Sequence, residues 1–301
     1  MMNQPARLRW KRLALVRGCL VIVLWVLRAS AVVADEPVAA NTVAQSPWQR
    51  IVMIGASATA GFTGSEPFGG TNTPKYALSR YVDAALTVSH DPVQNLGNAF
   101  FFFQPELIGR QQITRALTNN PTLIIGLDFP FWFCYGEGET DEARLERFGQ
   151  GLKLLETISC PLVVGDIPDA SAAVDKMLRP DQMPSLQCIA KANLRLKEWV
   201  AGQRNVGLVA LSDFMGNALA NHAITISDYT LPEGQTRILI QNDALHPSPP
   251  GCSVLALAVL EACQATRSAA QAEEFIHDPK VIFRKASKQS PAADTSQPAA
   301  K

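Results

Sequence analysis

The sequence has no excess of either charge and few histidines. Its 27 lysine and arginine residues balance 27 aspartate and glutamate residues, and it contains 4 histidines. Proteins that bind nucleic acid through charge carry a basic surface, so this balance argues against that class. Nor is the chain poor in hydrophobic residues. Their share of 47% is enough for a packed core and excludes a wholly disordered protein.

Cysteine is also scarce, and it follows no metal-binding pattern. None of the 6 cysteines forms a Cys-x-x-Cys pair or clusters with a histidine, so we expect no metal and no cofactor. Loss of an N-terminal segment containing Cys19 would leave an odd number, so at least one thiol would be free or would bridge two chains. Cys134, Cys160 and Cys188 are the better candidates for a disulfide, with their pairing open. Buried inert thiols are the alternative.

The apolar run near the N-terminus is shorter than a membrane-spanning helix. It covers residues 18–27, whereas a spanning helix needs ~20 apolar residues. Basic residues precede it at 7–17 and small residues follow it at 29–34. This order is typical of a cleaved signal peptide over residues 1–34, with an uncleaved inner-membrane anchor as the alternative. We therefore expect a periplasmic or secreted protein, in contact with a membrane only through this segment if it is retained.

Beyond this segment the chain has a linker, one domain and a tail. Residues 35–48 are polar and alanine-rich, as in a linker, and residues 287–301 lack large apolar side chains, as in a disordered tail. Residues 49–276 alternate short apolar runs with helical patterns, which predicts an α/β domain with a mostly parallel sheet. The expected strands are 51–54, 93–96, 123–126, 162–164 and 206–211. The expected helices are 76–86, 105–117, 140–157, 184–203 and 252–272, with Arg144 on a solvent-exposed face.

A glycine and a serine follow the first expected strand directly, in the segment Gly55-Ala56-Ser57-Ala58. The glycine allows a sharp turn that leaves the Ser57 hydroxyl and N–H at the carboxyl end of the strand, where ligands bind in such sheets. A serine needs a base to become a nucleophile. The alternative is a small-residue turn with Ser57 as a helix cap. A phosphate loop is excluded because the required glycine spacing and lysine are absent.

An aspartate and a histidine lie three residues apart in a proline-rich loop far along the chain, at Asp243 and His246. The carboxylate can accept a hydrogen bond from one ring nitrogen, which leaves the other nitrogen free to take a serine proton. A capping aspartate beside a surface histidine is the alternative. We interpret His90, His222 and His277 as surface or structural residues.

Taken together, the two motifs resemble those of the SGNH hydrolases, also called the GDSL-type esterase/lipase family. The first family block, Gly-Asp-Ser-Leu, is similar to residues 55–58, and the last block, Asp-x-x-His, is similar to residues 243–246. The resemblance covers residues 50–272. It implies a flavodoxin-like three-layer α/β/α sandwich with a mostly parallel five-stranded sheet. It also implies hydrolysis of an acyl or acetyl ester of a small molecule, glycan or lipid, with Ser57, His246 and Asp243 as catalytic residues and no metal.

The middle blocks of the family fit less closely. The resemblance implies an oxyanion hole formed by the N–H groups of Ser57 and Gly97, the nearest match to the family's glycine. Asp128 occupies a position where the family has an asparagine that donates to the oxyanion. Asp128 could be protonated and donate, bind the substrate, or turn away and cap a neighbouring loop. This departure keeps open a rival class, a non-catalytic binding or scaffold protein with the same fold.

Two aromatic clusters also follow expected strands, at residues 100–103 and 129–135. A closed hydrophobic core is one interpretation, because aromatic side chains supply much of the area that a core buries. An acyl-binding pocket near Ser57 is the second. Contact with a membrane surface or a partner is the third.

Overall fold

A computed structural model describes residues 46–137, 140–267 and 274–289. These residues belong to the structural unit Ala44–Lys301. The expected signal segment 1–34, most of the expected linker and nearly all of the expected tail lie outside the described residues. Within the described part of the chain, no helix is both long enough and apolar enough to cross a membrane.

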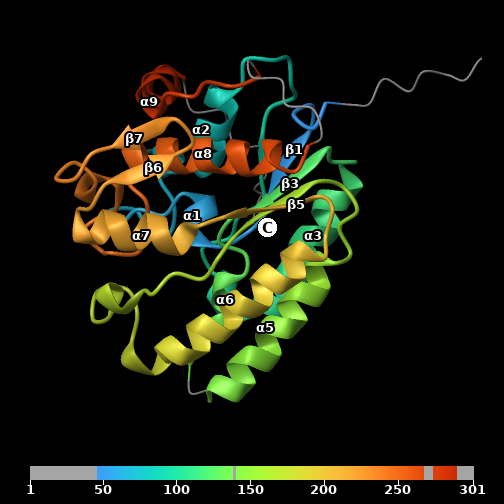
Figure 1. Ribbon diagram of the computed structural model, residues 1–301, viewed down its shortest axis with the longest axis vertical. Coiled ribbons are helices and arrows are strands. Elements are labelled where there is room, and N and C mark those ends of the chain that lie inside the picture. The colour runs from blue at the N-terminus through green and yellow to red at the C-terminus, as the bar shows by residue number, and fades with distance from the viewer. Residues whose placement is uncertain (1–45, 138–139, 268–273, 290–301) are drawn as a thin grey trace, which may run out of the picture. The chain divides into compact units, whose positions relative to one another are not determined.

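The centre of the fold is a five-stranded sheet with the strand order β2-β1-β3-β4-β5 (Figure 1). All four pairs of neighbouring strands are parallel. This is the strand order of a flavodoxin-like fold, which the resemblance implied. The strands are β1 (Ile51–Met53), β2 (Gln94–Asn95), β3 (Leu123–Gly126), β4 (Leu162–Gly165) and β5 (Val206–Val209).

Four of the five strands, β1, β3, β4 and β5, are mainly buried, whereas the two residues of β2 are half-buried. Along the first strand and the residue after it, Ile51 and Met53 pack into one hydrophobic core, while Val52 and Ile54 pack into the other. Successive side chains of a strand point to opposite faces, so a sheet covered on both sides needs apolar residues at every position. This explains why β1, β3, β4 and β5 appear in the sequence as continuous apolar runs.

Helices form a layer on each face of the sheet (Figure 1). One layer contains α2 (Leu78–Ala85), α8 (Pro249–Gln264) and α9 (Pro279–Lys288). The other contains α3 (Pro105–Thr118), α5 (Asp141–Leu155) and α6 (Leu186–Ala201). The three-layer α/β/α sandwich is thus confirmed.

Shorter elements lie between these layers and at the edges of the sheet. They are the helices α1 (Ser57–Ala60), α4 (Phe131–Cys134) and α7 (Leu211–Ala220), the antiparallel pair β6 (Ile224–Ile226) and β7 (Tyr229–Leu231), and the 3-10 turns η1 (Thr73–Lys75), η2 (Phe101–Phe103), η3 (Ser171–Ala173), η4 (Pro180–Gln182) and η5 (Arg237–Leu239). The sequence did not predict α7, because its apolar start continued the run of β5.

The folded domain extends beyond both boundaries drawn from the sequence. At the N-terminal side, Trp48 is fully buried, and its Nε1 donates to Glu274 Oε2 at 2.7 Å. At the C-terminal side, Ile282 and Ala286 of α9 are fully buried in the core with α2 and α8. The predictions that the linker runs to residue 48, the domain ends at 276 and the tail starts at 287 are therefore wrong. The ten-residue helix α9 escaped detection because charged residues surround its few buried positions.

Arg144 is buried, although its charge predicted a solvent-exposed position. Its side chain is 2% exposed, and its guanidinium donates to the carbonyl oxygens of Gln182 at 3.1 Å and Asp181 at 3.0 Å. Burial of a charged group is tolerated when its donors are hydrogen-bonded. The helix pattern was right here, but the carbonyl partners come from a distant turn.

The described cysteines are free thiols. Those of Cys134 and Cys188 lie in hydrogen-bonding contact with each other, and burial raises the pKa of the Cys134 thiol. Of the three cysteines considered for a disulfide, these two are neighbours in the fold. Cys252 and Cys263 are buried as well, as expected of inert thiols.

Candidate active site

Ser57 stands at the carboxyl edge of the sheet, where the strand order reverses between β1 and β3. The chain turns at Gly55 with φ +144°, a conformation that favours glycine. A Cβ atom at this position would lie 2.1 Å from Asp128 Oδ1, so a side chain has no room. Gln112 of α3 holds the same turn. Its Oε1 accepts from Gly55 N at 3.0 Å, and its Nε2 donates to Gly55 O at 2.8 Å.

The structure brings together the three residues predicted to be catalytic. Ser57 Oγ lies 2.8 Å from His246 Nε2, and His246 Nδ1 lies 2.8 Å from Asp243 Oδ2. The other carboxylate oxygen, Asp243 Oδ1, accepts from the N–H groups of Leu245 at 2.9 Å and His246 at 3.0 Å. The aspartate is thereby fixed, the ring is fixed by the aspartate, and the second ring nitrogen faces the serine hydroxyl.

The surroundings of Asp243 favour its ionised form. Burial raises the pKa of this carboxyl group, but hydrogen bonds from the His246 ring, the charge of that ring and the N–H groups of His246 and Leu245 lower it by more. The net result is a pKa below the ordinary value of an aspartate. An ionised carboxylate in this place can orient the imidazole and stabilise it when it carries a second proton.

The histidine loop is held by the start of α8. Ser248 caps this helix, with its side chain accepting from Gly251 N at 3.2 Å, and its own N–H donates to Leu239 O at 2.8 Å. A Cβ at position 251 would lie 1.9 Å from Leu239 O, so the close approach of η5 to α8 requires this glycine. Ser248 and Gly251, which follow His246 in the sequence, therefore fix the position of the loop that carries this histidine.

Two residues that the sequence did not single out join the serine and histidine segments. The ring of Phe62 stacks on the ring of His246, with 4.2 Å between the centroids. The Nε2 atom of Gln241 donates to Phe62 O and to Pro247 O, both at 2.9 Å. Gln241 thus connects the chain just after Ser57 to the chain just after His246. Its partner Phe62 is 179 positions away in the sequence, so no local pattern could have identified this connection.

Asp128 lines the site but supplies only acceptors. Its Oδ1 accepts from Ala56 N at 3.0 Å and Thr59 Oγ1 at 2.6 Å, while Oδ2 accepts from Ala58 N at 2.9 Å and Thr59 N at 3.2 Å. Of the three roles considered for it, this geometry corresponds to a cap on a neighbouring loop, and the loop is the one that carries Ser57. A protonated Asp128 that donates to an oxyanion does not fit, because all four contacts need an acceptor.

The backbone N–H of Ser57 is available as an oxyanion donor. It makes no hydrogen bond to the residues that the structure describes, while Asp128 occupies the N–H groups on either side. The N–H of Gly97, in contrast, donates to Asn95 Oδ1 at 2.8 Å. The structure therefore contradicts the expectation that Gly97 contributes to the oxyanion hole, because the turn it belongs to has already used its donor.

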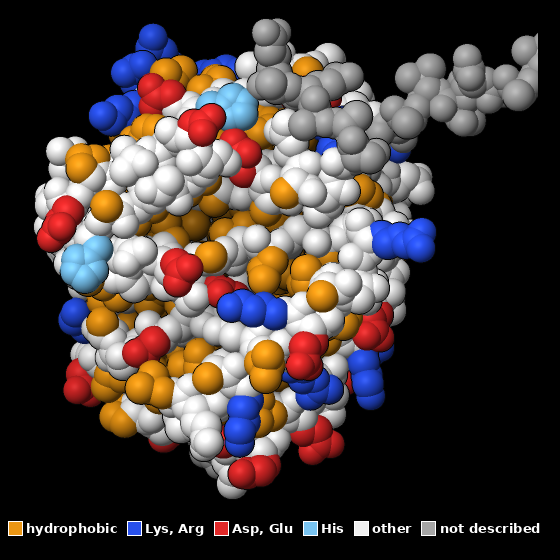
Figure 2. Space-filling model, in the orientation of Figure 1, with side chains coloured by type: hydrophobic (Ala, Val, Ile, Leu, Met, Phe, Trp, Pro, Cys, Tyr) orange, Lys and Arg blue, Asp and Glu red, His pale blue; other side chains and the backbone are white. Residues whose placement is uncertain are grey.

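An apolar pocket opens beside the serine and the histidine. Its volume is about 50 Å³, and the side chains that line it are mainly Leu127, Phe131, Trp132, Phe214, Met215 and Leu255. Figure 2 shows hydrophobic side chains in a hollow on this face, in the region where Figure 1 places α1 and α7. The second aromatic cluster thus divides: part of it lines the pocket, whereas Phe129 and Phe133 are fully buried in the core.

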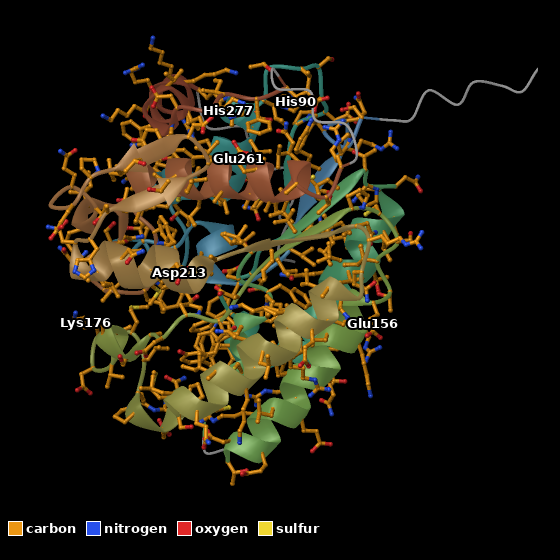
Figure 3. The ribbon with its side chains drawn as sticks, viewed as in Figure 1. His90, Glu156, Lys176, Asp213, Glu261 and His277 are labelled. Atoms are coloured by element: carbon orange, nitrogen blue, oxygen red, sulfur yellow. The ribbon has the colours of Figure 1, made fainter. Side chains whose placement is uncertain are left out.

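Two of the other histidines, His90 and His277, have partners of their own. His90 contacts Val88 O at 2.9 Å through Nδ1 and Asp83 Oδ1 at 3.3 Å through Nε2, and His277 Nδ1 lies 2.9 Å from Glu261 Oε1. Figure 3 shows His90, His277 and Glu261 near α2 and α9, away from α1. Within the described ranges, no group of three or more histidine, cysteine, aspartate or glutamate residues is placed to hold a metal ion.

The fold and this site define an α/β/α protein with a hydrogen-bonded serine, histidine and aspartate at the carboxyl edge of its sheet. No protein-family model matches the chain, and the comparison with curated proteins gives no significant match. Solved structures of lipases, acylhydrolases and esterases are similar to it. A lipase/acylhydrolase from Enterococcus faecalis is 18% identical with a TM-score of 0.49, over 74% of this chain and 100% of that chain.

Two further solved structures are similar over nearly the same share of the chain. A putative acylhydrolase from Bacteroides fragilis is 15% identical with a TM-score of 0.46, over 73% of this chain and 88% of that one. An acetyl-xylooligosaccharide esterase from Geobacillus, a mutant of Axe2, is 14% identical with a TM-score of 0.44, over 71% of this chain and 94% of that one.

Proposed function

We propose that this protein is an exported serine hydrolase of the SGNH type that cleaves carboxylic esters. The observation that carries the proposal is the continuous hydrogen-bonded series from Ser57 Oγ through the two nitrogens of His246 to Asp243 Oδ2, with both contacts at 2.8 Å. The apolar pocket beside Ser57 gives the acyl group of an ester a place next to the nucleophile.

In the proposed reaction, Ser57 Oγ attacks the carbonyl carbon while its proton passes to His246 Nε2. Asp243 holds the ring and stabilises the resulting imidazolium. The Ser57 N–H stabilises the negative charge that develops on the carbonyl oxygen. His246 then gives the proton to the leaving alcohol, and water, activated by the same ring, releases the acyl group from the serine.

Export is part of the proposal and is supported by the basic residues, the short apolar run and the small residues within positions 7–34. An active protein would then meet its ester in the periplasm or outside the cell. The proposed natural substrate is an acyl or acetyl ester of a small molecule, glycan or lipid.

A fluorophosphonate probe tests the proposed function directly, because it reacts covalently with an activated serine and leaves an ordinary serine unmodified. The full-length protein should be labelled on Ser57, and Ser57→Ala should not be labelled. A chromogenic ester panel on the same two proteins provides the second readout. Equal hydrolysis by both would contradict the proposal.

A further inference from the structure

A row of aromatic rings leads from the pocket wall to the surface. It starts at Trp132, which lines the pocket, and continues through Phe102, Phe103, Phe100 and Phe68. The distances between successive ring centroids are 5.4, 4.1, 6.2 and 6.1 Å. We call these five side chains the aromatic row. It runs from the pocket across three segments of the chain, which are the helix α4, the turn η2 with the residue before it, and the loop that carries Phe68.

The outer end of the aromatic row is exposed to solvent. Phe68 is 83% exposed, Phe103 is 68% exposed and Phe100 is 45% exposed. Their neighbour Phe101 is fully buried, so the turn η2 anchors one ring in the core and presents the adjacent ones outward. Isolated exposed apolar residues are common on protein surfaces, but a contiguous apolar patch beside a site is a mark of binding.

The loops that carry the row are held in place. The carboxylate of Glu66 accepts from Asn72 N at 2.7 Å and Thr73 N at 2.8 Å, which closes the loop with Phe68 at its tip. Asn98 Oδ1 accepts from Phe100 N at 2.8 Å and fixes the start of the turn. The exposed rings are therefore presented by ordered backbone, which lowers the entropic cost of binding a ligand.

We propose that the aromatic row is a binding site for the fatty acyl chain of the substrate, so that the enzyme acts on medium- and long-chain acyl esters. This inference rests on the proposed function, because it places the ester carbonyl at Ser57 and the first acyl carbons in the pocket. The chain then continues past Trp132 onto the exposed rings.

The chemistry of the row favours an acyl chain as its occupant. Four of its five members are phenylalanines, which have neither a hydroxyl nor an indole N–H. A sugar chain presents hydroxyl groups that these rings cannot pair, whereas a methylene chain needs only apolar contact. Each CH₂ group that is fully buried strengthens binding by about fourfold, so the effect of the row should grow with chain length.

The test uses p-nitrophenyl acetate and decanoate, both below the micelle concentration of the decanoate, and the double variant Phe100→Ser/Phe103→Ser. The ratio of kcat/KM for decanoate to that for acetate should fall about tenfold or more, while kcat/KM for acetate stays within about twofold of wild type. The control Leu194→Ser removes an equally exposed apolar side chain, 59% exposed, from α6 and should leave the ratio unchanged.

Two results would overturn the proposal. One is an unchanged ratio, whether or not both esters lose activity equally, and the other is a loss seen only with micellar substrate, which would indicate docking to a lipid surface. Binding of p-nitrophenyl decanoate to the Ser57→Ala protein, measured by calorimetry, separates this inference from the proposed function. If no ester is hydrolysed but decanoate binds and the double variant weakens it, the proposed function fails and the binding site stands. Decanoate binding that the double variant leaves unchanged would overturn the site itself.

Discussion

The replacement Asp128→Asn distinguishes two opposite expectations for the same residue. The resemblance to the SGNH hydrolases implies that an asparagine at this position would donate to the oxyanion, so the replacement could restore a donor and raise kcat. The structure predicts the reverse. The carboxylate of Asp128 accepts four hydrogen bonds, three of them from backbone N–H groups of the loop that carries Ser57. An asparagine has one acceptor oxygen, and its NH₂ group would face donors.

The expected loss of stability follows from the number of N–H donors that would lose their acceptor. Whichever way the asparagine amide is turned, at least one buried backbone N–H loses its acceptor, at a cost of about 1–3 kcal/mol. The remaining hydrogen bonds also become weaker, because their acceptor is no longer charged. We therefore expect Asp128→Asn to lower the free energy of unfolding by about 2–4 kcal/mol. A displaced Ser57 loop should also lower kcat by about 10- to 100-fold, because small misplacements of a reacting group are costly.

Urea unfolding and kcat/KM on p-nitrophenyl acetate, measured on the same preparation, check both numbers. Asp166→Asn is the matched control, since Asp166 is also buried, follows the next strand and accepts from Ser212 N and Ser212 Oγ at 2.6 Å each. It should lose stability and keep its activity per folded molecule. A variant Asp128→Asn that is as stable as wild type and more active would refute the reasoning.

The remaining predictions concern Gln241, Asp243 and the N-terminus. Gln241→Glu removes the two N–H donors that join the serine and histidine segments, so it should lower kcat about tenfold. The control Gln235→Glu, at an exposed position, should leave kcat unchanged. Steady-state kinetics on acetate esters measure both effects. The folded-state pKa of Asp243 is lowered, so its charge stabilises the fold above the unfolded-state pKa and stops doing so as the pH falls through the folded value. Asp243→Asn should therefore be less stable than wild type at pH 7, with the difference shrinking towards pH 3 in urea titrations. N-terminal sequencing of exported protein should begin near Val32 or Asp35, and a product that keeps Met1 in the cytosol would contradict export.

The sequence predicted the parts of this structure that depend on local pattern. Four of the five strands appear as apolar runs because both faces of the sheet are covered, whereas β2 consists of Gln94 and Asn95. The turn at Ser57 follows from a glycine directly after a strand. Asp243 and His246 are three residues apart, so their contact could be inferred from spacing. The meeting of Ser57 with His246 was inferred only from the resemblance, because 189 positions separate them.

The features that the sequence could not predict depend on individual side-chain hydrogen bonds, and in two of the three cases the partner is far along the chain. Arg144 is buried because two carbonyl oxygens of a distant turn receive its guanidinium. Gln112 holds the turn at Gly55 from 57 positions away. Gly97 fitted the family's oxyanion glycine by position alone, and the side chain of Asn95 takes its N–H instead. Each is a side-chain hydrogen bond that leaves no periodic signal in the sequence.

The central claim is that Ser57 is the nucleophile of an ester hydrolase, and steady-state hydrolysis by Ser57→Ala tests it most directly. The change removes the oxygen that lies 2.8 Å from His246 Nε2 and leaves the fold and the pocket in place. We predict a loss of about 10³-fold or more in kcat on every ester that the wild type cleaves, with unchanged stability in urea. A variant that keeps its activity within a few-fold of wild type would show that Ser57 is not the nucleophile.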